Sequence, residues 1–184
     1  MYIKTSENND PRIFMLIGGS FNGKTKMGMK LAIKHDAVFI SRSQIKQMLK
    51  INGTKRPSSK IINKILLHMI LQAVGTNRNV VIDGGFTTAK SREQLLEILN
   101  CLASVEGFLT NQNLQEYKQN YNTVNIMYYS IIGVYIKPNY KLALKRNRQC
   151  NYPINIYRLQ EQYSTLEKPY KDEGFTEIIE KRAK

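Results

Sequence analysis

The sequence predicts an α/β fold in which a parallel β-sheet of four to five strands carries helices on both of its faces. Short apolar runs of strand length alternate along the chain with longer stretches of helical spacing, which is the pattern of βαβ units. A glycine-rich segment, Gly18–Thr25, also stands between the first apolar run and the first helical stretch. At 184 residues the chain has the length of a single domain.

The first elements follow one another closely. The apolar run Ile13–Ile17 predicts a strand buried on both faces, and Lys24–Lys34 predicts the first helix. Ala37–Ile40 predicts a second strand. We interpret Ser41–Lys50 as a turn that enters a short helix, which stops near residues 52–53, Asn-Gly.

A longer helix is predicted from Pro57–Ser59 to Gly75. Its apolar residues follow helical spacing, and they are Ile61, Ile62, Ile65, Leu66, Met69, Ile70 and Ala73. The run Val80–Ile82 predicts a third strand that ends at Asp83. Ser91–Gln94 fits a capping box and therefore predicts the start of the next helix.

The last third of the chain begins with a polar, Asn- and Gln-rich segment, which we interpret as an insertion over about residues 108–127. Tyr128–Ile136 predicts the fourth strand. A helix is predicted from Pro138 to Arg148, and another over Ile154–Leu166. Gly174–Ile179 has the length of either a short strand or a short helix, and the pattern leaves both open.

Residues 18–25 carry every fixed residue of the phosphate-binding P-loop, G-x-x-x-x-G-K-[ST]. In such a loop, backbone N–H groups and a helix N-terminus point at the phosphates. Lys24 is expected to reach the β- and γ-phosphates, and the Thr25 hydroxyl to bind Mg²⁺. We therefore predict that ATP and Mg²⁺ bind to Gly18, Gly19, Ser20, Phe21, Asn22, Gly23, Lys24 and Thr25.

Three polar segments lie at the ends of predicted strands: Gly18–Thr25, Ser41–Lys46 and Asp83–Thr88. Ligands of such sheets bind outside the carboxyl ends of the strands, so these segments predict the site. Asp83 could hold a Mg²⁺-bound water or an acceptor hydroxyl; alternatively it caps its own turn.

Arg146 and Arg148 lie late in the helix that follows the fourth strand. Arginines in this place can close over the phosphates and stabilise the charge that develops during phosphoryl transfer. The alternative is a solvated helix end, where cations are favoured in any case.

The formal net charge is +14, and it is unevenly distributed. Residues 24–64 hold eleven Lys and Arg and a single acid, Asp36, whereas residues 161–180 hold six acids. A polyanionic partner such as nucleic acid would explain the basic half, with Arg42, Lys46, Lys55 and Arg56 at the acceptor side. The alternative is an AT-rich genome, since Lys outnumbers Arg 19 to 9.

Several classes of protein fit the sequence poorly. Cys101 and Cys150 are far apart and lack metal-type spacing, so a disulfide framework is not expected and a reducing cytoplasm fits. The polar N-terminus lacks the pattern of a signal peptide, and no apolar run has the ~20 residues needed to cross a bilayer. Neither Ser20 nor Ser41 has partners for a hydrolytic triad.

Several of these segments, in this order, resemble the kinase domain of phage-type 5′-polynucleotide kinases. They are the P-loop Gly18–Thr25, Phe39–Lys46 at the second strand, Val80–Asp83, the arginine-rich Leu144–Arg148, and the ending Tyr163–Pro169 with Glu173–Phe175. The resemblance covers about residues 12–179. It implies one P-loop kinase domain over residues 1–184, with an arginine lid at about residues 140–153.

The resemblance also implies acceptor-binding roles for Arg42, Ser43 and Lys46, and here the chain departs from the family. The family has an Asp at the Ser43 position, where the carboxylate accepts the proton of the acceptor hydroxyl. A serine cannot act as a carboxylate base, so that role passes to Asp83 or Asp36, or the acceptor differs. Lys46 stands where the family's basic residue grips the acceptor phosphate.

The sequence therefore favours an ATP-dependent kinase that phosphorylates a hydroxyl of a nucleic acid, as 5′-polynucleotide kinases do. One alternative is a phage DNA-modification kinase acting on a hydroxymethyl base, which in that case works in the host cytoplasm. A small-molecule nucleotide kinase is a second alternative. A nucleotide-binding pseudokinase module is a third, and Ser43 is the feature that favours it.

Overall fold

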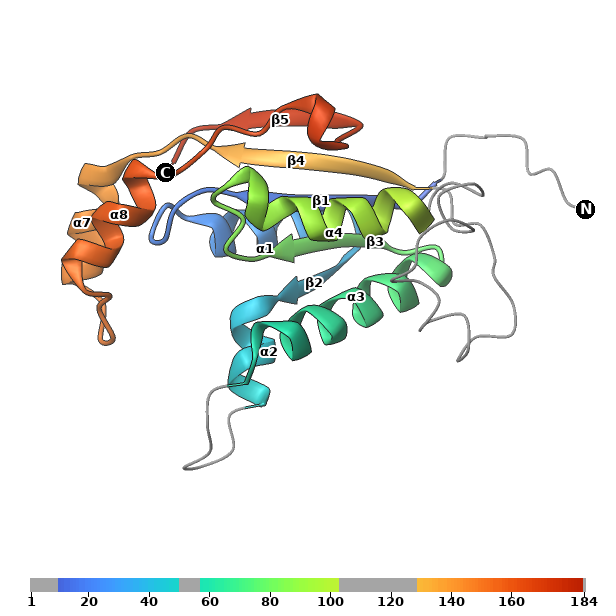
Figure 1. Cartoon of the computed structure of the whole chain (residues 1–184), viewed down its shortest axis with the longest axis horizontal. Coiled ribbons are helices and arrows are strands. Elements are labelled where there is room, and N and C mark those ends of the chain that lie inside the picture. The colour runs from blue at the N-terminus through green and yellow to red at the C-terminus, as the bar shows by residue number, and fades with distance from the viewer. Residues whose placement is uncertain (1–9, 50–56, 103–128, 184) are drawn as a thin grey trace, which may run out of the picture.

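The computed structural model describes residues 10–49, 57–102 and 129–183. Five parallel strands form one sheet in the order β2-β3-β1-β4-β5 (Figure 1). The strands are β1 Arg12–Ile17, β2 Ala37–Ser41, β3 Asn79–Asp83, β4 Ser130–Ile136 and β5 Glu177–Lys181. The predicted fold class is confirmed, and the ambiguous last segment is a strand, with Ile178 beside Gly133 of β4.

The helices are α1 Lys24–Lys34, α2 Arg42–Met48, α3 Ser59–Gly75, α4 Ala89–Leu102, α7 Tyr140–Arg148 and α8 Ile156–Ser164, with a 3₁₀ turn η1 at Lys171–Glu173. Helices α3 and α4 cover one face of the sheet and α1 covers the other (Figure 1). Helices α7 and α8 stand outside the carboxyl ends of the strands (Figure 1).

Strand β1 shows why both faces need helices. Its side chains alternate between two cores: Ile13, Met15 and Ile17 pack with α3 and α4, whereas Phe14 and Leu16 pack with α1. All five are buried. A strand with no polar face has to be covered on both sides, as the unbroken apolar run in the sequence predicts.

Three boundaries differ from the sequence-based expectation. Helix α4 begins at Ala89, because Thr88 and Ser91 cap each other through hydrogen bonds of 3.1 and 3.2 Å; the box predicted at Ser91–Gln94 is therefore wrong by one turn. Helix α8 is shorter than expected at both ends, because the Asn155 side chain caps its start and Thr165 caps its end. The predicted insertion at 108–127, like Lys55 and Arg56, lies outside the described residues.

Candidate functional site

The P-loop runs from the end of β1 to the start of α1. Gly23 caps α1 in the left-handed conformation, with φ of 89°. Glycine adopts this conformation without a steric penalty, which turns the following N–H groups of the helix start toward the loop. The strand–loop–helix context that the motif requires is therefore present.

Lys24, Thr25 and Asp83 meet at the centre of the site. The Lys24 ammonium donates a 2.6 Å hydrogen bond to the Gly19 carbonyl, and the Thr25 hydroxyl donates one of 2.6 Å to the Asp83 carboxylate. Asp83 is buried at the end of β3. A hydroxyl and a carboxylate side by side are oxygen ligands of the kind that Mg²⁺ takes together with phosphate oxygens and water. The residues present thus fit a magnesium ion.

The ammonium of Lys24 is held in a partly desolvated place. Burial lowers its pKa to about 8, and the negative charge of Asp83 raises it in part. An anion placed against this group would stabilise the protonated form and restore the charge. A bound phosphate would therefore raise the pKa of Lys24 and keep its ammonium protonated.

Asn22 holds the P-loop to the end of β4. Its side-chain amide donates 3.0 Å hydrogen bonds to the carbonyls of Ile136 and Lys137, and the residue is buried. The sequence predicts Asn22 as a nucleotide-binding residue of the loop, and in the structure its side chain bonds the loop to the end of β4.

Helix α8 clamps the outer turn of the P-loop. The Gln162 side-chain oxygen accepts a 2.9 Å hydrogen bond from the Ser20 N–H, and the Tyr163 hydroxyl donates one of 2.8 Å to the Ser20 carbonyl. A Cβ on Gly19 would come within 2.6 Å of the Tyr163 ring, so the position accepts only glycine. Sequence reasoning missed Gln162, because no motif marks it.

The two predicted lid arginines behave differently. Arg146 donates a 3.0 Å hydrogen bond to the Phe21 carbonyl, which places its guanidinium at the P-loop. Arg148 is exposed, and the described part of the chain gives it no hydrogen bond or ion pair. Only Arg146 is therefore in contact with the loop.

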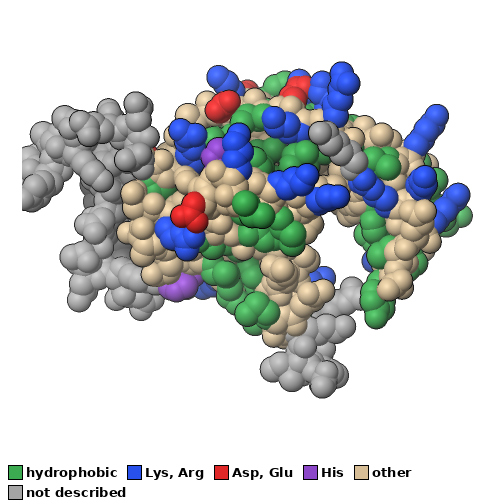
Figure 2. Space-filling model, turned by 180° about the vertical axis from the view of Figure 1, so that it is seen from behind, with side chains coloured by type: hydrophobic (Ala, Val, Ile, Leu, Met, Phe, Trp, Pro, Cys, Tyr) green, Lys and Arg blue, Asp and Glu red, His purple; other side chains and the backbone are tan. Residues whose placement is uncertain are grey.

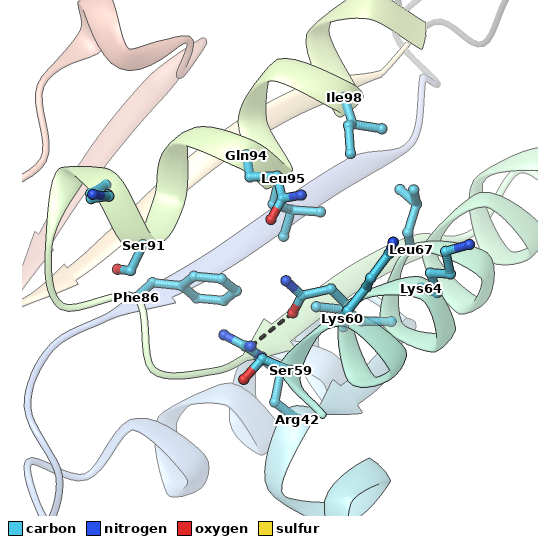
Figure 3. Close-up of a pocket in the computed structure, with 13 residues that line it drawn as sticks. Arg42, Ser59, Lys60, Lys64, Leu67, Phe86, Ser91, Gln94, Leu95 and Ile98 are labelled. Atoms are coloured by element: carbon cyan, nitrogen blue, oxygen red, sulfur yellow. Dashed lines mark hydrogen bonds between the residues drawn. The ribbon is translucent and has the colours of Figure 1, made fainter. Parts of the chain in front are cut away.

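A basic pocket of about 570 Å³ lies on the face of the sheet that α3 and α4 cover (Figure 3). Helices α2, α3 and α4 and the β3–α4 loop line it. Its cations are Arg42, Lys60, Lys64 and Lys90, and none of the described residues that line it is an acid. Arg42 donates a 2.7 Å hydrogen bond to Asn63 and lies 5.7 Å from the centre of the Phe86 ring. We name this cavity the acceptor pocket, after the role proposed for it below.

Two contacts place the acceptor pocket beside the P-loop. Ser41, at the end of β2, lies opposite Asp83 in the sheet. A Cβ on Gly84 would lie 2.8 Å from Arg42 Cδ, so the backbone next to Asp83 touches a wall of the pocket. The backbone that follows Asp83 therefore borders the acceptor pocket, while the Asp83 side chain bonds to Thr25.

The other residues predicted to bind the acceptor do not line the pocket. Ser43 shares a 2.8 Å hydrogen bond with Ser41, and Lys46 is exposed on α2. Asp36, one of the two candidates for the missing base, precedes β2 at the amino edge of the sheet and forms a 3.5 Å ion pair with Arg78. The sheet separates Asp36 from the site, so that candidate is wrong.

A buried arginine secures the loop that carries Phe86. Arg92 is fully buried and forms two hydrogen bonds with the Glu173 carboxylate, of 2.6 and 2.8 Å. The same guanidinium donates to the carbonyls of Phe86 and Glu167, both at 3.3 Å. The C-terminal segment thus fixes one wall of the acceptor pocket. In sequence, Arg92 was indistinguishable from a surface residue of α4.

The described parts of the chain hold neither a metal-binding cluster nor a membrane-spanning helix. No group of three or more His, Cys, Asp or Glu side chains there could hold a metal ion by itself. No helix among the same residues has both the length and the apolar character needed to cross a bilayer.

The family comparison gives a match over more than half of the chain. The model of the AAA domain family matches residues 13–123, which include the P-loop, Asp83 and the walls of the acceptor pocket. No curated protein matches the sequence significantly.

Solved structures with the same fold include kinases of different classes. A gluconokinase from Sinorhizobium meliloti 1021 has a TM-score of 0.54 and 14% identity, over 96% of this chain and 85% of that one. A chain of the Pnkp1/Rnl/Hen1 RNA repair complex has a TM-score of 0.57 and 17% identity, over 88% of this chain and 47% of that one. A fungal RNA kinase has a TM-score of 0.55 and 14% identity, with coverages of 92% and 73%.

This chain spans about half of the matching chain of the RNA repair complex. With identities of 14% and 17%, the likenesses show the fold, which is that of P-loop kinases.

Proposed function

We propose that this chain, which belongs to the AAA domain family, is an ATP-dependent kinase that phosphorylates a hydroxyl of a nucleic acid. The acceptor pocket carries this proposal. It gathers four cations and an aromatic ring near the end of β3, and the hydroxyl to be phosphorylated would lie between this pocket and the P-loop. A nucleic acid presents phosphates to such cations and a base or sugar to such a ring.

The donor side would bind the triphosphate of ATP. Backbone N–H groups of the P-loop, Lys24 and Arg146 would surround the β- and γ-phosphates, and Arg148 would reach them from the lid. The Thr25 hydroxyl and the Asp83 carboxylate would hold Mg²⁺, which neutralises phosphate charge when bound.

The reaction would be an in-line transfer between the two sides. The acceptor oxygen bonds to the γ-phosphorus while the bond to the β–γ bridging oxygen breaks, which leaves ADP and a phosphomonoester. The acceptor hydroxyl loses its proton. With Ser43 in place of a carboxylate and Asp36 at the opposite edge, we propose that Asp83 orients the hydroxyl and receives this proton.

Nucleic acid as the acceptor agrees with two structural relatives, a chain of an RNA repair complex and a fungal RNA kinase. A 5′-hydroxyl end is the acceptor that the polynucleotide-kinase resemblance implies. A hydroxymethyl base in DNA stays a second acceptor, since Ser43 removes the carboxylate that the 5′-end kinases use.

A small molecule is the competing acceptor class. The volume of about 570 Å³ lies within the range of small-molecule sites, and a gluconokinase shares the fold. A pseudokinase module is the remaining alternative, and the contacts of Lys24, Thr25 and Asp83 argue against it.

An acceptor panel with γ-labelled ATP and Mg²⁺ tests the proposal. The panel contains 5′-hydroxyl DNA and RNA oligonucleotides, duplex DNA with hydroxymethyl bases, mononucleotides and gluconate, with Lys24→Ala as the control. We expect label on a nucleic acid and none with the variant. Label on a small molecule alone would show that the acceptor is a small molecule and not a nucleic acid. ATP binding without label on any acceptor would favour the pseudokinase module.

A further inference from the structure

The turn between α7 and α8 exposes several apolar side chains. Residues 151–158, which we name the hairpin tip, are all exposed, and they include Tyr152, Pro153, Ile154, Ile156 and Tyr157. Tyr152 is 89% exposed and Tyr157 is 81% exposed. A run of exposed apolar side chains of this kind marks a place where another molecule binds.

Hydrogen bonds fix the backbone conformation of the hairpin tip, and this conformation keeps its side chains exposed. The buried Asn147 forms a pair of 2.7 Å hydrogen bonds with the backbone of Ile154. The Asn155 side chain accepts a 2.9 Å hydrogen bond from the Tyr157 N–H, and Leu159 anchors the next turn in the interior. These contacts hold the backbone while both tyrosine rings face solvent.

The charge around the hairpin tip identifies the kind of partner. Residues 137–164 contain six Lys and Arg and a single acid, Glu161. Three of the nine arginines of the chain lie here, at positions 146, 148 and 158. A lysine-rich composition does not account for this excess of arginine. In Figure 2, green apolar side chains gather along the arm formed by α7 and α8, with blue Lys and Arg at its outer rim.

We propose that the hairpin tip binds single-stranded nucleic acid, with Tyr152 and Tyr157 stacking on unpaired bases and Arg148 and Arg158 contacting phosphates. Exposed tyrosines interleaved with arginines are the surface on which single strands bind without dependence on sequence. This inference rests on the proposed function, and it adds that the substrate is a strand several nucleotides long with unpaired bases.

The anchoring of the hairpin explains how such a contact would serve the transfer. Gln162 and Tyr163 of α8 and Arg146 of α7 all bond to the P-loop. A strand stacked on the hairpin tip is therefore held at a fixed place relative to the nucleotide. Figure 2 shows an open gap between this arm and the body of the domain, and the acceptor end of the strand would pass across it.

Steady-state kinetics of Tyr152→Ala/Tyr157→Ala test the proposal. The acceptors are 5′-hydroxyl 12-mers of DNA and of RNA, the same 12-mers annealed to a complement, and a nucleoside 3′-phosphate. Ile33→Ala is the matched control, because Ile33 is 84% exposed on α1 at the amino edge of the sheet. Circular dichroism melting of each variant shows that the fold is intact.

We expect the double variant to raise KM for single-stranded 12-mers by about 100-fold, or about tenfold for each stacked base. KM for the nucleoside 3′-phosphate and for ATP, and kcat, should stay within about twofold of the wild type. Tyr152→Phe/Tyr157→Phe should restore KM, since phenylalanine keeps the stacking face.

The remaining outcomes separate this inference from the proposed function. If no nucleic acid is phosphorylated by the wild type, the proposed function has failed. If 12-mers are phosphorylated but the double variant matches Ile33→Ala, the hairpin tip does not bind the strand. If the double variant raises KM for ATP with every acceptor, the tip packs on the chain itself. If it raises KM for annealed 12-mers as much as for single-stranded 12-mers, base stacking is not the contact. Either result overturns the inference.

Discussion

The donor side and the acceptor side of the site are built in different ways. The P-loop is one run of eight residues, and its geometry depends on its own backbone and on bonds from β4, α7 and α8. The acceptor pocket is assembled from side chains spread over residues 42–98 on three helices and a loop. Substitutions of side chains leave a site made of contiguous backbone largely unchanged. In a pocket made of separate side chains, substitutions can change which acceptor binds without changing the fold.

The largest effect is expected on the donor side. Lys24→Ala removes the ammonium beside the P-loop and should lower kcat by about 10³-fold or more, as loss of a preorganised charge does in phosphoryl transfer. The melting temperature should change little, because the variant removes a desolvated charge. Transfer of label from γ-labelled ATP measures the first effect, and Lys26→Ala, two residues along α1, is the control. Retention of full activity would refute the role of the P-loop.

The acceptor side depends on a long-range clamp, and Arg92→Met breaks it. Glu173 would lose both hydrogen bonds from the guanidinium and stay partly buried, with the Tyr170 N–H as its remaining partner among those bonds. We expect the free energy of unfolding to fall by about 3–5 kcal/mol. Urea denaturation measures it. Arg92→Met/Glu173→Leu should recover part of the loss, and a loss below about 1 kcal/mol in the single variant would show that the clamp is unimportant.

The pH dependence of ATP binding is a property of the donor side alone. The pKa of Lys24 is lowered to about 8, and bound phosphates would keep the ammonium protonated. Affinity should therefore be constant below pH 8 and about tenfold weaker at pH 9 than at pH 7. Calorimetric titration with a non-hydrolysable ATP analogue measures this, and Lys24→Met should abolish the change.

The same lowered pKa affects the stability of the empty protein in the opposite direction. Between pH 8 and the ordinary lysine pKa of 10.5, the unfolded chain binds more protons at Lys24 than the folded chain does. This group therefore favours the folded state increasingly as pH rises through that window. A Lys24-dependent loss of stability over the same window would contradict the lowered pKa.

Removing charge from the acceptor pocket should leave the donor side untouched. Lys60→Gln/Lys90→Gln should raise KM for oligonucleotides about tenfold and make the dependence of log affinity on log salt shallower by about 0.7 per lysine. The values of kcat and of KM for ATP should not change. Lys30→Gln/Lys34→Gln, on the opposite face of the sheet, is the control. An equal effect of both pairs would mean that only net charge matters.

The smallest effect is expected at Ser43. Ser43→Asp restores the carboxylate of the polynucleotide kinases, and we expect kcat to rise by up to about tenfold. Adding a general base to a site that lacks one raises kcat by about 100-fold or more. The expected gain is smaller here, because the backbone next to Asp83, the proposed base, already borders the acceptor pocket. A gain of that larger size would show that Asp83 is not the base. A fall in kcat would indicate a different acceptor geometry.

The sequence predicted the donor side because its signals are local. The motif, the buried strand before it and the helix after it lie within Ile13–Lys34, and each is marked by residue type and spacing. The strand ends that converge on Asp83 followed from the parallel sheet. The position of the helix start at Thr88 did not, since Ser91–Gln94 matches the capping box whereas Thr88 has a serine three residues on.

The acceptor side was predicted only in part. Arg42 was expected there and lines the pocket, but Lys60, Lys90 and Phe86 carry no motif, and only the packing of α3 against α4 brings them together. Gln162 and Arg92 act over 142 and 81 residues of sequence, at the P-loop and at Glu173. Contacts of that separation leave no periodic signal in a single sequence.

The most direct test of the two-sided site is the initial rate of label transfer from γ-labelled ATP to a 5′-hydroxyl single-stranded oligonucleotide. The wild type, Lys24→Ala and Lys60→Gln/Lys90→Gln are compared at limiting and at saturating oligonucleotide. We predict transfer by the wild type, none above background by Lys24→Ala, and a defect of the pocket variant that disappears at saturation. The two-sided site would be contradicted if the wild type transferred no label, or if the lower rate of the pocket variant persisted at saturating oligonucleotide.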